Sequence, residues 1–456
     1  MCNKLILLFA FTSFGLVLAA VGPEKEPDVK ENKQIATVLS EISSKNIEAI
    51  IRKLVSFGTR HTLSDAQSET RGIGAARRWI QSEFERYSKE NGGRLEVGLD
   101  DFTQPPGERN PQPVQVVNVV ATLRGTQPES RDRVYVATGH YDSRVTDVMN
   151  ATADAPGADD DASGVAAIME MARVMSKRPW DATLVFIAVA GEEQGLFGST
   201  HWAKMAKEKN WNIAGMITND IVGSSHADDG RIVKDHVRLF AEGVPPLKEM
   251  PDSLRTLVRT GGENDSTARE LARFIKPVAE KQVRGMTVDI IYRRDRYLRG
   301  GDHSPFLDAG FPAVRMTEPN EDFRHQHQDL RKENAVQFGD LPEFCDFEYI
   351  AQVTRVNAAA LGALALAPAA PANVEVETKE LTNSTTLQWK PNLEPDVAGY
   401  EIVWRDTTAP LWQHTISAGN VTRFTVPVSK DNVLFGVRAH DKEGNTSPAT
   451  YPTPRR

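Results

Sequence analysis

Apolar runs of strand length alternate with a helical segment between Val116 and Gly223, and this alternation limits the fold more than any other feature. The four runs are VVNVVATL, RVYVATGH, TLVFIAVAGEE and IAGMITNDIVG, and a helical pattern follows DDDASG between the second and the third. Continuous runs rich in β-branched residues are typical of strands that are buried on both faces. The pattern therefore predicts an α/β domain with a central, mostly parallel, mixed sheet flanked by helices.

Helical periodicity extends this domain in both directions. IATVLSEISSKNIEAIIRKLVSF predicts one or two amphipathic helices, ARRWIQSEFERYSKE predicts another, and YIAQVTRVNAAALGALALA predicts a long one that an Ala/Pro-rich stretch ends. The predicted organisation is a signal segment over 1–20, a flexible lead-in over 21–35, the α/β domain over 36–366, a linker over 367–373 and a second domain over 374–456.

The second domain differs in kind from the first. Its short alternating runs, TTLQWKP, AGYEIVWRD, TRFTVPV and VLFGVRAHD, are separated by turn signals such as KEGN. They predict a small all-β sandwich whose core is filled by Trp389, Tyr400 and Phe435, and they resemble a fibronectin type III module. No catalytic cluster lies in it. A spacer, a structural appendage and a binding module for a protein or a surface polymer all fit this sequence.

The first twenty residues, MCNKLILLFAFTSFGLVLAA, have the form of a secretory signal. Lys4 gives a positive start, an apolar core follows, and small residues supply a cleavage site. The apolar core is short for a membrane span of roughly 20 residues. We therefore expect export to the periplasm or the extracellular space without a stable membrane anchor. Cleavage would remove Cys2 and leave Cys345 without an internal disulfide partner.

The charge balance gives no reason to expect nucleic acid as a partner. The net charge is −8 and the isoelectric point is near 5.8. The basic stretch RRDRYLR, residues 293–299, is offset by acidic segments, and such a run is usually a solvated face.

Metal-ligating residue types follow three of the four apolar runs. His140, Glu192–Glu193 and Asp220 lie where these runs end. In an open α/β sheet, ligands bind beyond the carboxyl ends of the strands. Asp159, Asp160 and Asp161 come between the first two of these positions, at the start of a helix.

The three adjacent aspartates are more than a helix cap requires. One carboxylate suffices for capping. Three of them close to Glu192, Glu193 and Asp220 would repel strongly, and a cation is the simplest remedy. A set of carboxylate oxygens and imidazole nitrogens favours Zn²⁺ or a similar divalent ion.

Further histidines occur downstream. The sequence RHQHQD supplies His325 and His327, either of which could add the imidazole that a two-metal centre still lacks, and GGDHSPF contains His303, which we expect to be a substrate-pocket or structural residue. Competing designs fit poorly, because no G-x-S-x-G or HExxH motif occurs and no cysteine is placed for nucleophilic work.

Taken in order, these segments resemble the M28 zinc aminopeptidases, relatives of the bacterial leucyl aminopeptidases. The matching segments, which fall within about residues 36–366, are TGHYDS, PGADDDASGVAA, VAGEEQGLFGS, TNDIVG, GDHSPF, GFPAV and HQHQD. The resemblance implies two Zn²⁺ ions, with Co²⁺ or Mn²⁺ as possible substitutes, on a zinc exopeptidase fold.

The resemblance also implies roles for individual residues. His140 and Asp220 would hold one ion, Glu193 and His325 the other, and Asp160 would bridge both. Asp142 would orient His140, and Glu192 would be the general base. His325 has the H-x-x-x-D spacing to Asp329 that is usual in the family, although His327 remains an alternative.

Two segments depart from the usual pattern of the family. Arg324 replaces the aromatic or aliphatic residue that usually precedes the last histidine. The stretch between Gly223 and Gly300 is long and polar for the smallest members, and it could shape the substrate pocket.

The function that follows is an exported zinc exopeptidase that removes N-terminal residues from peptides with a free amine. A carboxypeptidase or a dipeptidase on the same scaffold is the alternative. A glutaminyl cyclase, which uses a reduced metal set, and an inactive binding protein fit less well, because Glu192 and every candidate ligand are present.

Overall fold

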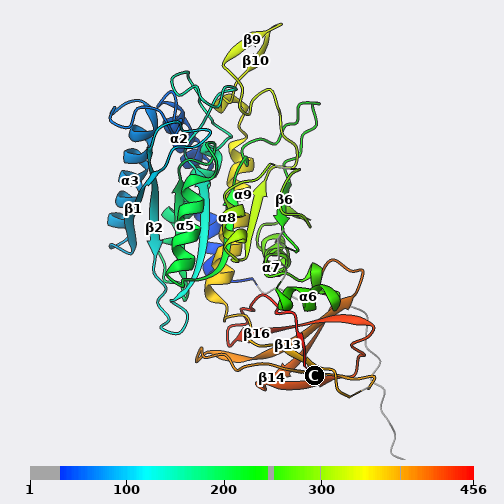
Figure 1. The fold of residues 1–456 in the computed structure, drawn as a ribbon. Coiled ribbons are helices and arrows are strands. Elements are labelled where there is room, and N and C mark those ends of the chain that lie inside the picture. The colour runs from blue at the N-terminus through cyan, green and yellow to red at the C-terminus, as the bar shows by residue number, and fades with distance from the viewer. Residues whose placement is uncertain (1–30, 245–250, 298, 381, 456) are drawn as a thin grey trace, which may run out of the picture.

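The computed structural model of the protein describes residues 31–244, 251–297, 299–380 and 382–455. It contains a large α/β body and a smaller β domain that carries the C-terminal residues (Figure 1). The expected signal segment over 1–20 and most of the expected lead-in lie outside the described residues. The first helix begins at Lys33, inside the segment that we expected to be flexible up to residue 35. No helix among the described residues combines the length and apolar character needed to cross a membrane.

An eight-stranded mixed sheet forms the centre of the α/β body. Its strands, in sheet order, are β1 (Leu95–Gln104), β2 (Val114–Leu123), β4 (Thr183–Val189), β3 (Arg133–His140), β5 (Asn212–Asn219), β8 (Ala313–Thr317), β6 (His236–Ala241) and β7 (Thr287–Ile291). The four central strands, β4, β3, β5 and β8, run parallel to one another, and the next strand on each side, β2 or β6, is antiparallel to them. This arrangement confirms the predicted fold class.

Helices cover both faces of this sheet. The helices are α1 (Lys33–Glu41), α2 (Ser44–Val55), α3 (Gly72–Glu90), α4 (Ala162–Met175), α5 (Phe197–Glu208), α6 (Asp252–Arg259), α7 (Thr267–Gln282), α8 (His303–Asp308) and α9 (Phe347–Leu366). Side chains of α4 and α9 join the larger core on one face, and those of α5 and α8 join a smaller core on the other. Successive side chains of a strand point to opposite faces. Accordingly, Tyr135 and Ala137 of β3 enter the larger core, whereas Val136 enters the smaller one.

The expected helices and strands match these elements closely, but several elements gave no clear signal in the sequence. The antiparallel edge strand β1, the strand β6 and the helices α5 to α8 were not predicted. They lie at the sheet edges and on its surfaces, where alternating polar and apolar residues make the pattern weaker than in the fully buried strand β4.

The C-terminal domain is a sandwich of two small sheets. One sheet has the order β15 (Arg423–Val426), β12 (Thr385–Gln388), β11 (Glu375–Glu377) and β17 (Thr453–Arg455), and the other has the order β14 (His414–Gly419), β13 (Val397–Asp406) and β16 (Val433–Asp441). Trp389, Tyr400 and Phe435 lie in its buried core, as expected. A separate hairpin of β9 (Arg331–Glu333) and β10 (Val336–Phe338) extends from the α/β body (Figure 1).

Buried ion pairs join the sandwich to the α/β body. Arg133, at the start of β3, contacts Glu394 at 2.9 Å, and Arg405 of β13 contacts Asp265, which lies just before α7, at 2.8 Å. All four side chains are almost fully buried. The sandwich is therefore fixed to the α/β body by specific contacts in addition to the linker over 367–373.

Candidate metal centre

The metal-ligating residue types come together at one edge of the central sheet. His140 is the last residue of β3, Glu192 and Glu193 follow β4, and Asp220 follows β5. Because β4, β3 and β5 are parallel neighbours, their carboxyl ends meet at the same edge. The structure thus brings together the three strand ends that the sequence singled out.

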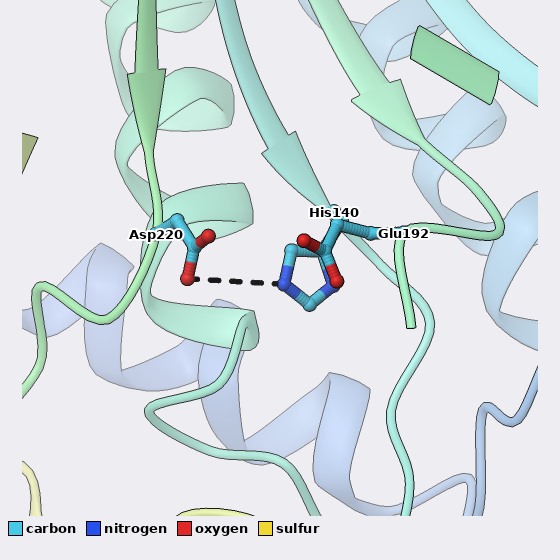
Figure 2. A group of neighbouring side chains, drawn as sticks. All are labelled: His140, Glu192 and Asp220. Carbon is cyan, nitrogen blue, oxygen red and sulfur yellow. Dashed lines mark ion pairs between the residues drawn. The ribbon is translucent and has the colours of Figure 1, made fainter. Parts of the chain in front are cut away.

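Among the residues that the structure describes, His140, Glu192 and Asp220 form the first of two groups that could each hold a metal ion (Figure 2). One potential ligand atom from each residue lies within 4.8 Å of the others, and Nε2 of His140 is 4.0 Å from Oδ1 of Asp220. His140 and Asp220 are buried. One imidazole and two carboxylates are a donor set that suits Zn²⁺.

Asp160, Glu193 and His327 form the second group. The two oxygens of Asp160 face different histidines: Oδ1 is 3.1 Å from Nε2 of His140, and Oδ2 is 2.8 Å from Nε2 of His327. Nε2 of His327 is also 3.0 Å from Oε1 of Glu193. Asp160 therefore lies between the two groups, where a carboxylate could bridge two ions.

The placement of His325 corrects the expectation that it would be the last ligand. The His325 ring stacks on Phe344, with the ring centroids 3.7 Å apart, and it does not line the cavity at the two groups. His325 and His327 lie in a chain of turns, and His327 has the left-handed φ of 55°, so the two side chains leave the backbone in different directions. Asp329 accepts a hydrogen bond from the backbone N–H of Thr146 and so anchors this loop, which explains why its spacing did not identify the ligand.

The other two aspartates of the triplet support the loop and the helix. Asp161 caps α4 by accepting a hydrogen bond from the backbone N–H of Gly164 at 2.9 Å, and it accepts another from the backbone N–H of His140. Asp159 accepts a hydrogen bond from the backbone N–H of Gly223 at 2.6 Å. These contacts hold the ends of β3 and α4 around Asp160.

Asp142 positions both His140 and the glutamate pair. Its Oδ1 lies 3.6 Å from Nδ1 of His140, and its carboxylate accepts hydrogen bonds from the backbone N–H groups of Glu192 and Glu193. Thr62 donates a further hydrogen bond to Asp142 at 2.9 Å. The backbone carbonyl oxygen of Asp142 lies 3.2 Å from Nδ1 of His140, within hydrogen-bond distance. Asp142 therefore fixes the second nitrogen of His140, as is usual for a histidine that binds a metal.

The protonation equilibria of the carboxylates reflect the crowding of negative charge. Burial raises the pKa of Glu192 well above its ordinary value, and Asp220 and Glu193 add to the rise while His140 opposes it. Burial also raises the pKa of Asp220, against the effect of Arg315 and His140. Asp160 differs: burial would raise its pKa, but His327 and His140 hold it well below the ordinary range. Bound cations would favour the ionised form of every one of these groups.

The residues present fit a metal pair. Each group offers one imidazole nitrogen and carboxylate oxygens, and two of the four carboxylates have pKa values that burial and mutual repulsion raise. Oε1 of Glu193 is buried, and its 3.0 Å contact with Nε2 of His327 does not have the geometry of a hydrogen bond. A buried carboxylate oxygen without a hydrogen bond is costly, and coordination of a cation would satisfy it.

Several polar neighbours of the two groups were not found from the sequence. Arg144 contacts Glu193 at 2.9 Å and His327 at 2.7 Å, and the buried Arg315 contacts Asp220 at 3.0 Å. Gln326 donates a hydrogen bond to Oδ2 of Asp160 at 2.9 Å. Of these residues, only Arg315 could have been found from the sequence. It lies inside the apolar run PAVRMTE, and an arginine in a buried strand needs an acidic partner.

A cavity of about 340 Å³ opens over the two groups. Its lining includes the groups themselves together with Arg109, Arg296, Arg299 and Gln326. Arg296 and Arg299 come from the long polar stretch between Gly223 and Gly300, so this stretch contributes to the cavity. The basic run over 293–299 is therefore not simply a solvated face. His303 is fully buried, with Nε2 2.8 Å from the carbonyl oxygen of Arg294, and it is a structural residue.

Comparisons with known proteins bear on the family of this chain. The sequence profile of Peptidase family M28 matches residues 118–337. The chain is 53% identical over 440 residues to a protein of Leptosphaeria maculans named as a probable zinc metalloprotease, and the match covers 96% of this chain and all of the relative.

Solved structures share the fold. The crystal structure of LapA from Legionella pneumophila has a TM-score of 0.51 at 20% identity, over 74% of this chain and 77% of that one. The aminopeptidase from Aneurinibacillus sp. strain AM-1 has a TM-score of 0.50 at 16% identity, over 72% of this chain and 95% of that one. These likenesses establish the zinc exopeptidase fold.

Proposed function

The chain belongs to peptidase family M28 and is a zinc metallopeptidase, and from this premise we propose that it is an aminopeptidase with two zinc ions. His140 and Asp220 would hold one ion, Glu193 and His327 the other, and Asp160 would bridge them. The observation that carries the proposal is the position of Asp160, whose two oxygens lie 3.1 and 2.8 Å from the imidazoles of the two groups. The aminopeptidase named among the structures of the same fold is consistent with it.

The metal pair would supply polarisation of the scissile carbonyl and a lower pKa for the attacking water. Glu192 lies in the first group. Since His140 and Asp220 would hold that ion and Asp160 would bridge the pair, the Glu192 carboxylate remains available for proton transfer. As general base it takes a proton from the attacking water and gives it to the leaving amine. Its backbone N–H donates to Asp142, so the residue that orients His140 also fixes the base.

Export and the role of the C-terminal sandwich complete the proposal. The apolar segment over 1–20 supports secretion, which would place the enzyme in the periplasm or the extracellular space. Its substrates there would be peptides with a free N-terminus. The sandwich lies against the α/β body and could still offer its remaining surface to a protein or a polymer.

The proposal is tested by comparing peptides that differ only at the amine. The wild-type protein should hydrolyse peptides with a free N-terminus and should leave their N-acetylated forms intact. Equal hydrolysis of the acetylated forms would overturn the aminopeptidase assignment, and release of C-terminal residues from them would favour a carboxypeptidase.

The role of Glu192 is tested by Glu192→Gln, with the exposed Glu208→Gln as the matched control. We expect Glu192→Gln to lower kcat by about a thousandfold, within the range found for general bases, while the zinc content stays at the wild-type value. Glu208→Gln should change neither quantity. Normal turnover in Glu192→Gln would remove this residue as the base.

A further inference from the structure

Four arginines line the cavity over the metal-binding groups, and only one of them pairs with a carboxylate of those groups. They are Arg109, Arg144, Arg296 and Arg299. The same lining contains four carboxylates, Asp160, Glu192, Glu193 and Asp220. If these carboxylates are committed to bound cations and to proton transfer, positive charge remains in the cavity.

Only part of this positive charge is neutralised by other acidic residues. Arg144 pairs with the ligand Glu193. Arg296 and Arg299 share the carboxylate of Glu321, each at 2.8 Å, and Arg238 contacts it at 3.1 Å. Arg296 also lies 3.7 Å from Asp295, which Arg315 contacts as well. Burial opposes ionisation of Glu321, yet Arg296 and Arg299 lower its pKa to about 2. Glu321 thus serves three cations, and the second carboxylate near Arg296 is shared with Arg315.

Arg109 and Arg299 have the most capacity left for a ligand. The guanidinium of Arg109 donates one hydrogen bond, to the carbonyl oxygen of Glu193 at 2.9 Å, and no carboxylate among the described residues lies within 4.0 Å of it. The side chain of Arg299 remains 41% exposed despite its contacts with Glu321 and Gln326. A guanidinium carries five N–H donors in a planar fork that suits a carboxylate.

The size of the cavity limits which ligand could present a carboxylate to these arginines. About 340 Å³ is at the small end of ligand cavities and suits one or two residues of a peptide. A short peptide carries a carboxylate in two places, either on an acidic side chain next to the scissile bond or at its free C-terminus.

We propose that this peptidase selects substrates that present a carboxylate to Arg109 and Arg299. This specificity rests on the proposed function, because it concerns the substrate of the same site. The carboxylate is that of an aspartate or glutamate beside the scissile bond, or the terminal carboxylate of a dipeptide or tripeptide. Arg296 holds Glu321 and thereby keeps Arg299 at the cavity wall.

The experiment uses three pairs of peptides that differ by one charge. Glu-Leu-amide is compared with Gln-Leu-amide, Leu-Glu-amide with Leu-Gln-amide, and Leu-Leu with Leu-Leu-amide. The first two pairs test an acidic side chain and the third tests the terminal carboxylate. For the wild-type protein we expect kcat/KM to be about tenfold or more higher for the charged member of at least one pair, as for a charge-assisted hydrogen bond.

Two variants assign that preference to the arginines. Arg299→Gln and Arg109→Gln should each bring the ratio of charged to neutral substrate close to one, mainly by lowering kcat/KM of the charged member. Arg124→Gln, a substitution of an exposed arginine that pairs with Glu96 on the surface, is the matched control and should keep the wild-type ratio. The zinc content of Arg109→Gln is measured because Arg109 holds the carbonyl of a ligand. If zinc is lost, Arg299→Gln decides the question.

Binding provides a readout that does not depend on turnover. The Glu192→Gln protein is titrated with the same peptides by calorimetry, and we expect a Kd about tenfold lower for the charged member, with the difference removed by adding Arg299→Gln. Wild-type ratios within twofold in all three pairs, or an unchanged ratio in both arginine variants, would overturn the proposal. Absence of hydrolysis of every peptide would overturn the proposed function instead, and calorimetry would still decide on the arginines.

Discussion

Two of the places where the protein buries ionic side chains differ in how their charges are matched. At the contact between the α/β body and the C-terminal sandwich, Arg273 and Arg405 surround Asp265 and Glu270. Arg405 contacts Asp265 through two hydrogen bonds of 2.8 and 3.0 Å, and Trp412 donates to Glu270 at 3.0 Å. Two cations meet two anions, and Arg273, Arg405 and Glu270 have further hydrogen bonds.

The metal centre has no such one-to-one pairing, because no arginine or lysine among the described residues lies within 4.0 Å of the carboxylates of Asp160 and Glu192. Asp160, Glu192, Glu193 and Asp220 gather there, and burial raises the pKa of both Glu192 and Asp220. Arg144 and Arg315 reduce the repulsion only in part. The contrast teaches that a matched buried cluster holds two domains together, whereas an unmatched one is prepared for a ligand that brings the missing charge.

The largest effect expected from this contrast is the removal of the metal. A strong chelator should abolish peptide hydrolysis and lower the Tm, because the four carboxylates would again repel one another and the stabilisation by binding would be lost. Zn²⁺ or Co²⁺ should restore both activity and Tm. Activity that survives complete removal of zinc, checked by elemental analysis, would contradict the comparison.

The two neighbouring histidines provide the next test. His327→Ala removes an imidazole from the second group, so we expect kcat/KM to fall by about a hundredfold or more, with less than two equivalents of zinc bound. His325→Ala is the matched control, because His325 stacks on Phe344 outside the cavity, and it should stay within about twofold of the wild type. The opposite result would return the ligand role to His325.

Substitutions in the cluster of Asp265, Glu270, Arg273 and Arg405 should lower the stability of the protein and leave its catalytic activity unchanged. Arg405→Ala leaves Asp265 buried with one fewer partner, and we expect the free energy of unfolding to fall by about 3–5 kcal/mol in urea titrations. The kcat/KM of the folded protein should remain within about twofold. Arg423→Ala, which removes an exposed pair with Glu377, should cost less than about 1 kcal/mol. A similarly small loss for Arg405→Ala would mean that the sandwich is only loosely attached.

The smallest effect concerns a hydrogen bond behind the ligands. Thr62→Val removes the hydroxyl that donates to Asp142, so Asp142 is held less firmly against His140. We expect the affinity for zinc, measured by competition with a chelator of known affinity, to fall by about tenfold. Thr37→Val on the exposed surface of α1 is the control. An unchanged affinity in Thr62→Val would show that the backbone contacts of Asp142 suffice.

The sequence predicted the fold and the strand-end residues because both follow from one simple pattern. Apolar runs that alternate with helices specify a parallel sheet, and the carboxyl ends of neighbouring parallel strands must meet, so His140, Glu193 and Asp220 could be grouped without a structure. Asp160 was distinguished from its neighbours by resemblance alone. The structure then gave the physical reason, since Asp159 and Asp161 are occupied by backbone N–H groups.

The remaining features depend on geometry that no local pattern records. The choice between His325 and His327 depends on the direction of each side chain in a series of turns. The cavity arginines come from segments far apart in the chain, such as Arg109 and Arg299, and only the fold brings them together. The docking of the sandwich depends on single arginines, Arg133 and Arg405, whose partners lie more than a hundred residues away.

Gln326 connects Arg299 to Asp160 through its side-chain amide. Its side-chain N–H donates to Oδ2 of Asp160, and its side-chain oxygen accepts from Arg299. A displacement of Arg299 by an arriving anion would therefore be transmitted, through a single amide, to the carboxylate that lies between the two imidazoles. Binding of the substrate carboxylate would therefore affect the metal centre as well. We expect substitutions of Gln326 to change kcat together with KM.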